Sequence, residues 1–164
     1  IVACLSIGPD SHAVAQVSAP LKRRIGRYAY VAAAMRQLAR WPREPVYISG
    51  ELADGTPFAC SAEAVIASHG AFYAGPFRLS PRAGLAADSV ELVTLHRSTR
   101  IGTAALTGAA MLRLPLDRLG LAEIRTVRKV VFDRCVSPVQ VDGDHVPGCD
   151  DTIAASGMAL RYVV

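Results

Sequence analysis

The chain has 164 residues, 51 % of them hydrophobic and 20 % charged, so it is long and apolar enough for one folded domain with a sizeable core. Its net charge of +4 favours anionic partners, namely nucleotide phosphates, anionic lipid headgroups or nucleic acid. Aromatic residues make up only 6 %, so a nucleic-acid surface on which bases stack is the least favoured of the three. No stretch approaches the roughly 20 apolar residues of a membrane span, and no secretory signal is visible.

Two further features concern the cellular compartment and the extent of the chain. The four cysteines lie far apart and form no CxxC pair, so reduced thiols in the cytoplasm are expected. They are Cys4, Cys60, Cys135 and Cys149. The chain opens on the apolar run Ile1–Leu5 without a starting Met, as the inside of a strand does, so we expect the sequence to be a piece of a longer protein.

In chain order, residues 1–7 predict a strand that the turn Gly8-Pro9-Asp10 ends. Apolar residues at helical spacing from Leu21 to Leu38 then predict a long helix, which Pro42 stops. The first turns of this helix are basic, and the cluster is either an ordinary solvated face or a patch for phosphates or a membrane. It consists of Lys22, Arg23, Arg24 and Arg27.

From Pro45 the pattern changes to β, with Asp54-Gly55-Thr56 as a turn and a loop around Phe72-Tyr73. Runs of β-branched and alternating apolar residues predict the strands. These are Val46–Ser49, Phe58–Ser68, Phe77–Leu79, Ser89–His96, Ile124–Phe132 and Ala159–Val163. A shorter helix is predicted over Thr99–Leu112, capped by Ser98. Its apolar face is expected to consist of Ile101, Ala105, Ala109 and Leu112.

Many short strands, few helices and no βαβ alternation indicate a mainly β (α+β) fold. We expect an antiparallel β-sandwich with one long and one short helix, filling residues 1–164 as a single domain.

The most informative stretch for function is Pro138–His145. Val139 and Val141 have the period of a half-buried strand, and Asp142-Gly143 can adopt the positive φ angles of a tight turn. Asp142 and Asp144 would then stand at a rigid strand end, where both can point at one small volume. Such a pair suits a magnesium ion, a general base or a hydroxyl to be oriented, and the alternative is a solvated hairpin turn.

Other motifs are less informative. Asp54-Gly55-Thr56 lacks the second glycine and the helix of a nucleotide-binding loop, so a hairpin turn is expected there. No Walker-type loop and no GxGxxG occurs, so the chain has no recognisable phosphate cradle of its own. The group His145, Cys149, Asp150 and Asp151 matches no zinc spacing. Asp10 could orient a substrate hydroxyl, although a turn or cap role is the simpler interpretation.

Four segments together resemble the C-terminal half of the diacylglycerol kinase-like lipid kinases, the superfamily that includes sphingosine kinases and YegS-type enzymes. The first is Gly8–His12 with the Lys-x-x-x-Gly-x-x-x-Tyr-like helix Leu21–Tyr30. The others are Tyr73–Ala83, similar to yyGGg-x-x-x-aPxA, Asp88–Val93, similar to DGxLdvv, and Pro138–Asp144, similar to pvqiDGE. The order of the segments matches the family's, and they span nearly the whole chain.

The resemblance implies the substrate-side β-sandwich of a two-domain lipid kinase, whose N-terminal nucleotide domain, with its Gly-Gly-Asp-Gly-Thr motif, is absent from this sequence. Asp142 would be the general base on a lipid hydroxyl or would assist that base, Asp144 would face ATP and the catalytic magnesium, and Asp10 would contact the headgroup hydroxyls of the lipid. Asp88 would match a carboxylate that binds a structural magnesium in some members. Asp144 replaces the usual Glu, Pro9 a Phe and Ser89 a Gly.

We therefore expect an ATP- and Mg²⁺-dependent kinase of a diacylglycerol-like or sphingoid-like lipid, inactive as this isolated chain. Its expected partners are the lipid and its own nucleotide domain, with no nucleic acid. We expect a cytoplasmic location with peripheral contact at the inner membrane face. The alternative is a non-catalytic lipid-binding or dimerisation sandwich, and homodimerisation is open under either hypothesis.

Overall fold

A computed structural model describes eleven parts of the chain, and strands dominate them. These parts are residues 4–17, 23, 33, 36–37, 45–70, 72–73, 77–78, 89–96, 99–133, 138–146 and 152–154. The main sheet contains β1 (Cys4–Ile7), β2 (Val46–Leu52), β3 (Pro57–Ala62), β4 (Ala64–Ser68), β7 (Val90–Leu95), β8 (Glu123–Asp133), β9 (Val139–Val141), β10 (Asp144–Val146) and β11 (Thr152–Ala154). The described helices are α1 (Pro9–Gln16) and α4 (Arg100–Met111). β5 (Phe72–Tyr73) and β6 (Phe77–Arg78) form a separate pair.

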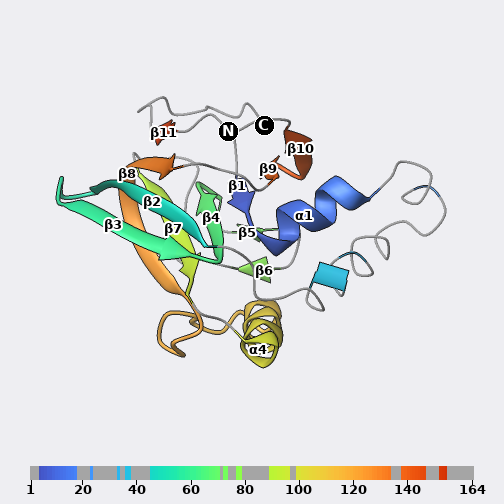
Figure 1. Cartoon of the computed structure of the whole chain (residues 1–164). Helices are drawn as coiled ribbons and strands as arrows, with labels where there is room; N and C mark the ends of the chain where they lie inside the picture. The colour runs from blue at the N-terminus through green and yellow to red at the C-terminus, as the bar shows by residue number, and fades with distance from the viewer. Residues whose placement is uncertain are drawn as a thin grey trace, which may run out of the picture.

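The order across the main sheet is β10-β9-β1-β4-β7-β8-β2-β3, and each of these pairings is antiparallel (Figure 1). β8 is the bent strand of this sheet. Its residues 123–127 pair with β7, and its residues 127–133 pair with β2 on the other edge. The register slips at Arg128, opposite the Glu51/Leu52 step of β2, as in a β-bulge. β11 pairs with Lys129–Val131.

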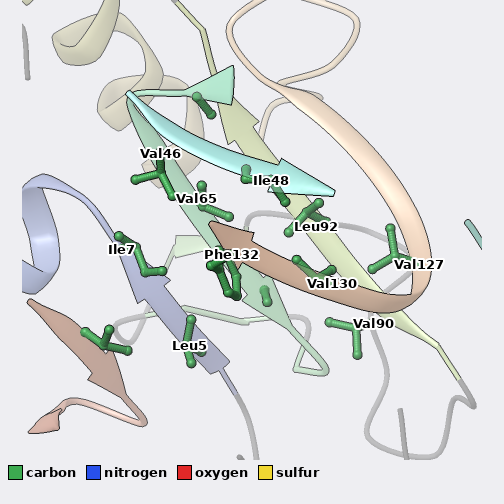
Figure 2. Packing of buried hydrophobic residues seen from close by; sticks show 13 residues of the cluster. Leu5, Ile7, Val46, Ile48, Val65, Val90, Leu92, Val127, Val130 and Phe132 are labelled. Carbon is green, nitrogen blue, oxygen red and sulfur yellow. The ribbon is translucent and has the colours of Figure 1, made fainter. Parts of the chain in front are cut away.

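One apolar core lies between the two ends of this sheet (Figure 2). Its members come from β1 and β9 near one end of the strand order and from β2, β3 and β8 near the other, so the sheet folds over on itself. The largest fully buried members include Phe132, Ile7 and Leu92. This arrangement confirms the predicted antiparallel, sandwich-like fold.

The inner strands β4 and β7 are buried on both faces, which explains their unbroken apolar character. One face carries the main core. On the other face, Ile66 and Val93 pack against Ala109 of α4 and against Leu116 in the turn that follows. α4 is therefore the helix that covers this part of the sheet.

The first helix begins where the sequence predicted only a turn. α1 starts at Pro9, because proline presets φ for a first helical position and Ser11 caps the end. The Ser11 hydroxyl accepts the Gly8 N–H at 2.9 Å and donates to the Gly8 carbonyl at 2.8 Å. Gly8 has φ +147°, and a Cβ there would lie 2.8 Å from the Cβ of Ala64. Glycine is therefore required at the junction of β1 and α1.

Other local predictions had mixed outcomes. Phe72–Tyr73 is a short strand and not a loop, and the predicted strand Phe58–Ser68 breaks at Glu63. Of the apolar face predicted for α4, Ala109 is buried, whereas Ile101 is 82 % exposed and Leu112 73 %. Most of the predicted long helix lies outside the described residues, as does the strand Ala159–Val163. The described positions within that helix are all helical, namely Arg23, Ala33, Arg36 and Gln37.

Candidate functional site

The β9–β10 hairpin holds the central carboxylate of the candidate site. β9 ends at Val141, and the chain reverses through Asp142 (φ +50°) and Gly143 (φ +95°). Two consecutive positive φ angles are those of a type I′ turn, which Asp-Gly favours because aspartate tolerates and glycine readily adopts this conformation. β9 pairs with β1 on its other side, so the turn is attached to the main sheet. The structure confirms the predicted strand and tight turn.

Asp142 is hydrogen-bonded to Cys4, the first residue of β1. The Asp142 N–H donates to the Cys4 carbonyl at 3.0 Å, and the Asp142 carboxylate accepts the Cys4 N–H at 2.8 Å. The first of these bonds extends the β1–β9 pairing by one residue. In the second bond, the Cys4 N–H is accepted by the side chain of Asp142. The carboxylate therefore has a defined place although its residue is exposed.

Asp10 belongs to the same neighbourhood. It lies in the first turn of α1, a helix that packs against β1, β9 and β10. The pKa of the Cys4 thiol is raised, first by burial, then by the charge of Asp142 and, more weakly, by that of Asp10. Both carboxylates thus act on one buried thiol, although Asp142 is bonded to the start of β1 and Asp10 follows the end of that strand.

Asp144 occupies a different position in the hairpin. It stands opposite Val141 in the β9–β10 pair, so it lies on the face that carries the valines of β9, and it is exposed. Asp142 is instead hydrogen-bonded to Cys4 of the neighbouring strand β1. The two aspartates are close in sequence, and the turn gives them different surroundings. Asp88, the predicted ligand of a structural magnesium, lies outside the described residues.

A buried polar row continues from this site across the sheet. Cys4 is paired with Ser68, Ser68 with Glu91, and Glu91 with Thr126. Glu91 is only 3 % exposed and accepts a 2.6 Å hydrogen bond from the Thr126 hydroxyl. Because direct cross-strand partners share a face, these side chains form one row on the face opposite the main core.

A second polar pair lies beside that row. Ser6 and Gln140 are cross-strand partners, both buried, and the Ser6 hydroxyl donates to Gln140 Oε1 at 2.5 Å. Neither residue was predicted to belong to a site. The available signal was a polar residue inside each of three otherwise apolar runs: Ser6 in Cys4–Ile7, Glu91 in residues 90–93 and Gln140 in Val139–Val141.

The donor set of the site is made of oxygen atoms that suit hard cations and hydroxyls. Mg²⁺ is commonly held by one or two carboxylates together with water and substrate phosphates, so Asp142 and Asp144 fit as partial ligands. Within the part of the chain that the structure describes, no three His, Cys, Asp or Glu side chains converge as a complete metal site. The described helices also include none long and apolar enough to cross a bilayer.

Comparison with known proteins identifies a shared fold. No protein-family model matches the sequence, and no curated protein matches it either. Among solved structures, a candidate diacylglycerol kinase of Bacillus anthracis strain Sterne superposes with a TM-score of 0.56 at 15 % identity, over 90 % of this chain and 48 % of that one. Another such structure from this strain gives 0.56 at 12 % identity over the same shares. A diacylglycerol kinase of the same strain gives 0.51 at 8 % identity, over 89 % and 43 %.

These similarities extend over nearly all of the present chain and about half the length of each neighbour. The chain therefore has the fold of one half of these proteins.

Proposed function

We propose that this chain is the substrate-side domain of an ATP- and Mg²⁺-dependent lipid kinase, which phosphorylates a hydroxyl of a diacylglycerol-like or sphingoid-like lipid. The observation that carries the proposal is the anchored Asp142 carboxylate, with Asp10 on α1, the helix that packs against β1, β9 and β10. The shared fold with half of each diacylglycerol kinase structure supports it.

Asp142 has the role of general base or orienting group. A carboxylate can accept about four hydrogen bonds, so the bond to the Cys4 N–H is compatible with a further one from a substrate hydroxyl. Accepting that proton makes the lipid oxygen a better nucleophile for phosphoryl transfer, which depends chiefly on positioning and charge neutralisation. The hydrogen bond to β1 keeps the carboxylate in place during this step.

Asp10 and Asp144 take the flanking roles. Asp10 would accept hydrogen bonds from headgroup hydroxyls at the end of α1. Asp144, exposed on β10, would hold Mg²⁺, an ion that supplies charge neutralisation on the transferred phosphate. The phosphates of ATP need a cradle that this sequence does not contain, so we propose that another domain of the full-length protein supplies it and that this chain alone is inactive.

The test is ATP-dependent phosphorylation of diacylglycerol and sphingosine by the full-length gene product and its Asp142→Asn variant. Asparagine keeps a side-chain oxygen for the Cys4 N–H, so the fold should persist while the base is lost. We expect kcat to fall by about 10²–10⁴-fold. Asp10→Asn should instead raise KM for the lipid.

The matched control is Asp54→Asn. Asp54 also precedes a glycine in a β-turn, and its carboxylate also accepts a backbone N–H at 2.8 Å, that of Thr56. This variant should retain wild-type turnover. If Asp142→Asn and Asp54→Asn phosphorylate lipid equally well, Asp142 is not the base. A full-length protein that binds lipid without any ATP-dependent turnover would favour the non-catalytic sandwich.

A further inference from the structure

The outward face of α4 is apolar and uncovered. Ile101, Ala105 and Leu112 fall within about 40° of one another around the helix axis, and all three are exposed. Ala109, about 40° further round the axis than Ala105, packs on the sheet, so the exposed stripe lies beside the buried side of α4. In the turn that follows, Leu114 is 44 % and Leu119 51 % exposed. Exposed large apolar side chains gathered on one element mark an interaction surface.

The same segment is basic. Residues 99–122 contain three arginines and a single acidic residue, Asp117. Arg100, Arg113 and Arg118 are all exposed. An apolar stripe bordered by arginine is the pattern of a helix that lies at an anionic bilayer surface, with its apolar side chains in the headgroup boundary.

A second copy of the chain fits this surface less well. Two such faces would bring arginines of like charge together. A stable dimer also buries roughly 800 Å² per partner, whereas a helix of 12 residues offers a footprint of about 18 Å by 10 Å. Charge and size therefore both favour an anionic lipid surface over self-association.

We propose that the outward face of α4, with the turn that follows it, docks the protein on anionic membranes. Ile101 and Leu112 enter the headgroup boundary, and the three arginines pair with lipid phosphates. In Figure 1 this helix lies apart from the β9–β10 hairpin and α1, so the docking surface is separate from the carboxylate site. The proposal does not depend on kinase activity, because binding is measured without ATP.

Arg113 allows a sharp test, because its backbone is unfavourable for arginine. It has φ +57° at the end of α4, where the Leu114 N–H reaches back to the Ala109 carbonyl at 2.9 Å. Glycine is the residue that this geometry prefers, so Arg113→Gly removes a charge without straining the fold.

The experiment is sedimentation of the full-length protein with vesicles of phosphatidylcholine and phosphatidylglycerol in equal parts, compared with pure phosphatidylcholine. We expect binding to the anionic vesicles only, weakening as salt is added. Ile101→Ser/Leu112→Ser should bind at least tenfold more weakly. Arg113→Gly should bind about fivefold more weakly, since one arginine near an anionic surface contributes about that factor.

Two variants control for apolar surface and for net charge elsewhere. Tyr47→Ser removes a side chain that is 59 % exposed on β2, and Arg128→Ala removes an exposed cation from β8. Both should bind like the wild type. The proposal is overturned if the wild type ignores anionic vesicles or if the α4 variants bind as well as these controls. It is also overturned if the α4 substitutions abolish a concentration-dependent dimer and leave vesicle binding intact.

Discussion

The backbone N–H of Cys4 and the carboxylate of Asp142 form a 2.8 Å hydrogen bond between residues 138 positions apart. The bond couples the edge of β1 to the turn that follows β9, and it holds the Asp142 carboxylate at the residue that carries a buried thiol. Cys4 is consequently a natural reporter on the geometry of the candidate site.

The first prediction concerns the reactivity of Cys4. Its pKa is raised above the ordinary 9.0 by burial and by Asp142 and Asp10, so alkylation by iodoacetamide should be slow at neutral pH. Asp10→Asn removes one of these charges and should lower the pH at which the thiol reacts. The measurement is mass spectrometry of a chain in which Cys60, Cys135 and Cys149 are replaced by serine. An unchanged pH profile would show that Asp10 lies too far from Cys4 to share its site.

The same shift predicts how stability changes in alkali. Because the folded protein holds the Cys4 proton more tightly than the unfolded chain, this contribution is intact below the unfolded pKa and is lost as pH rises through the folded one. Cys4→Ser should therefore flatten the loss of stability above about pH 9, measured as urea midpoints. A wild type and variant that lose stability in parallel there would contradict the shift.

The second prediction concerns acid and the other Asp-Gly turn. The pKa of Asp54 is lowered, chiefly by the hydrogen bond from the Thr56 N–H. The ionised form is favoured in the folded state, so its stabilisation is present above the unfolded pKa of 3.8 and disappears as pH falls through the folded pKa. Asp54→Asn should weaken this acid dependence in urea titrations. If variant and wild type lose the same stability as the pH falls, this contribution of Asp54 is ruled out.

The third prediction compares two glycines. A Cβ at Gly50 would lie 2.0 Å from the Lys129 carbonyl oxygen, whereas a Cβ at Gly108 meets nothing within 4 Å. Gly50→Ala should disrupt the β2–β8 pairing and cost at least about 1–3 kcal/mol. Gly108→Ala should stabilise α4 by about 0.5–1 kcal/mol. Urea denaturation of both variants measures the difference, and equal midpoints would show that β2 and β8 do not approach this closely.

The fourth prediction concerns the buried polar row. Thr126→Val removes the hydroxyl that donates to Glu91, a carboxylate that is 3 % exposed, and should cost about 1–3 kcal/mol of unfolding free energy. Thr126→Ser keeps the donor and is the control. If valine is tolerated as well as serine, the hydroxyl contributes nothing to the fold.

Local features of the site were predictable from the sequence, and long-range ones were not. Asp142-Gly143 predicts its own turn because two adjacent residues decide the positive φ angles. The pairing of β9 with β1 has no such local signal, so the place of Cys4 beside Asp142 appears only in the folded chain. Gly8-Pro9 ends a strand and also begins a helix, and only the first of these roles was predicted from the sequence.

The face of α4 illustrates a different limit. Helical spacing correctly grouped Ile101, Ala105 and Leu112, but periodicity reveals only that an apolar stripe exists. Which side meets the sheet is decided by the partners of α4, and here Ala109 faces Ile66 and Val93. The large apolar residues therefore remain outside.

The pairing of β1 with β9 also determines when the site can form during synthesis. Within this domain β1 leaves the ribosome well before β9, so Asp142 cannot reach Cys4 until the residues between them have emerged. Until then, the edge of β1 that will pair with β9 has no strand to bind, and such an edge invites pairing with other chains. A translation arrest before residue 139 should yield a nascent chain prone to aggregation, and closing so distant a contact should make folding slow.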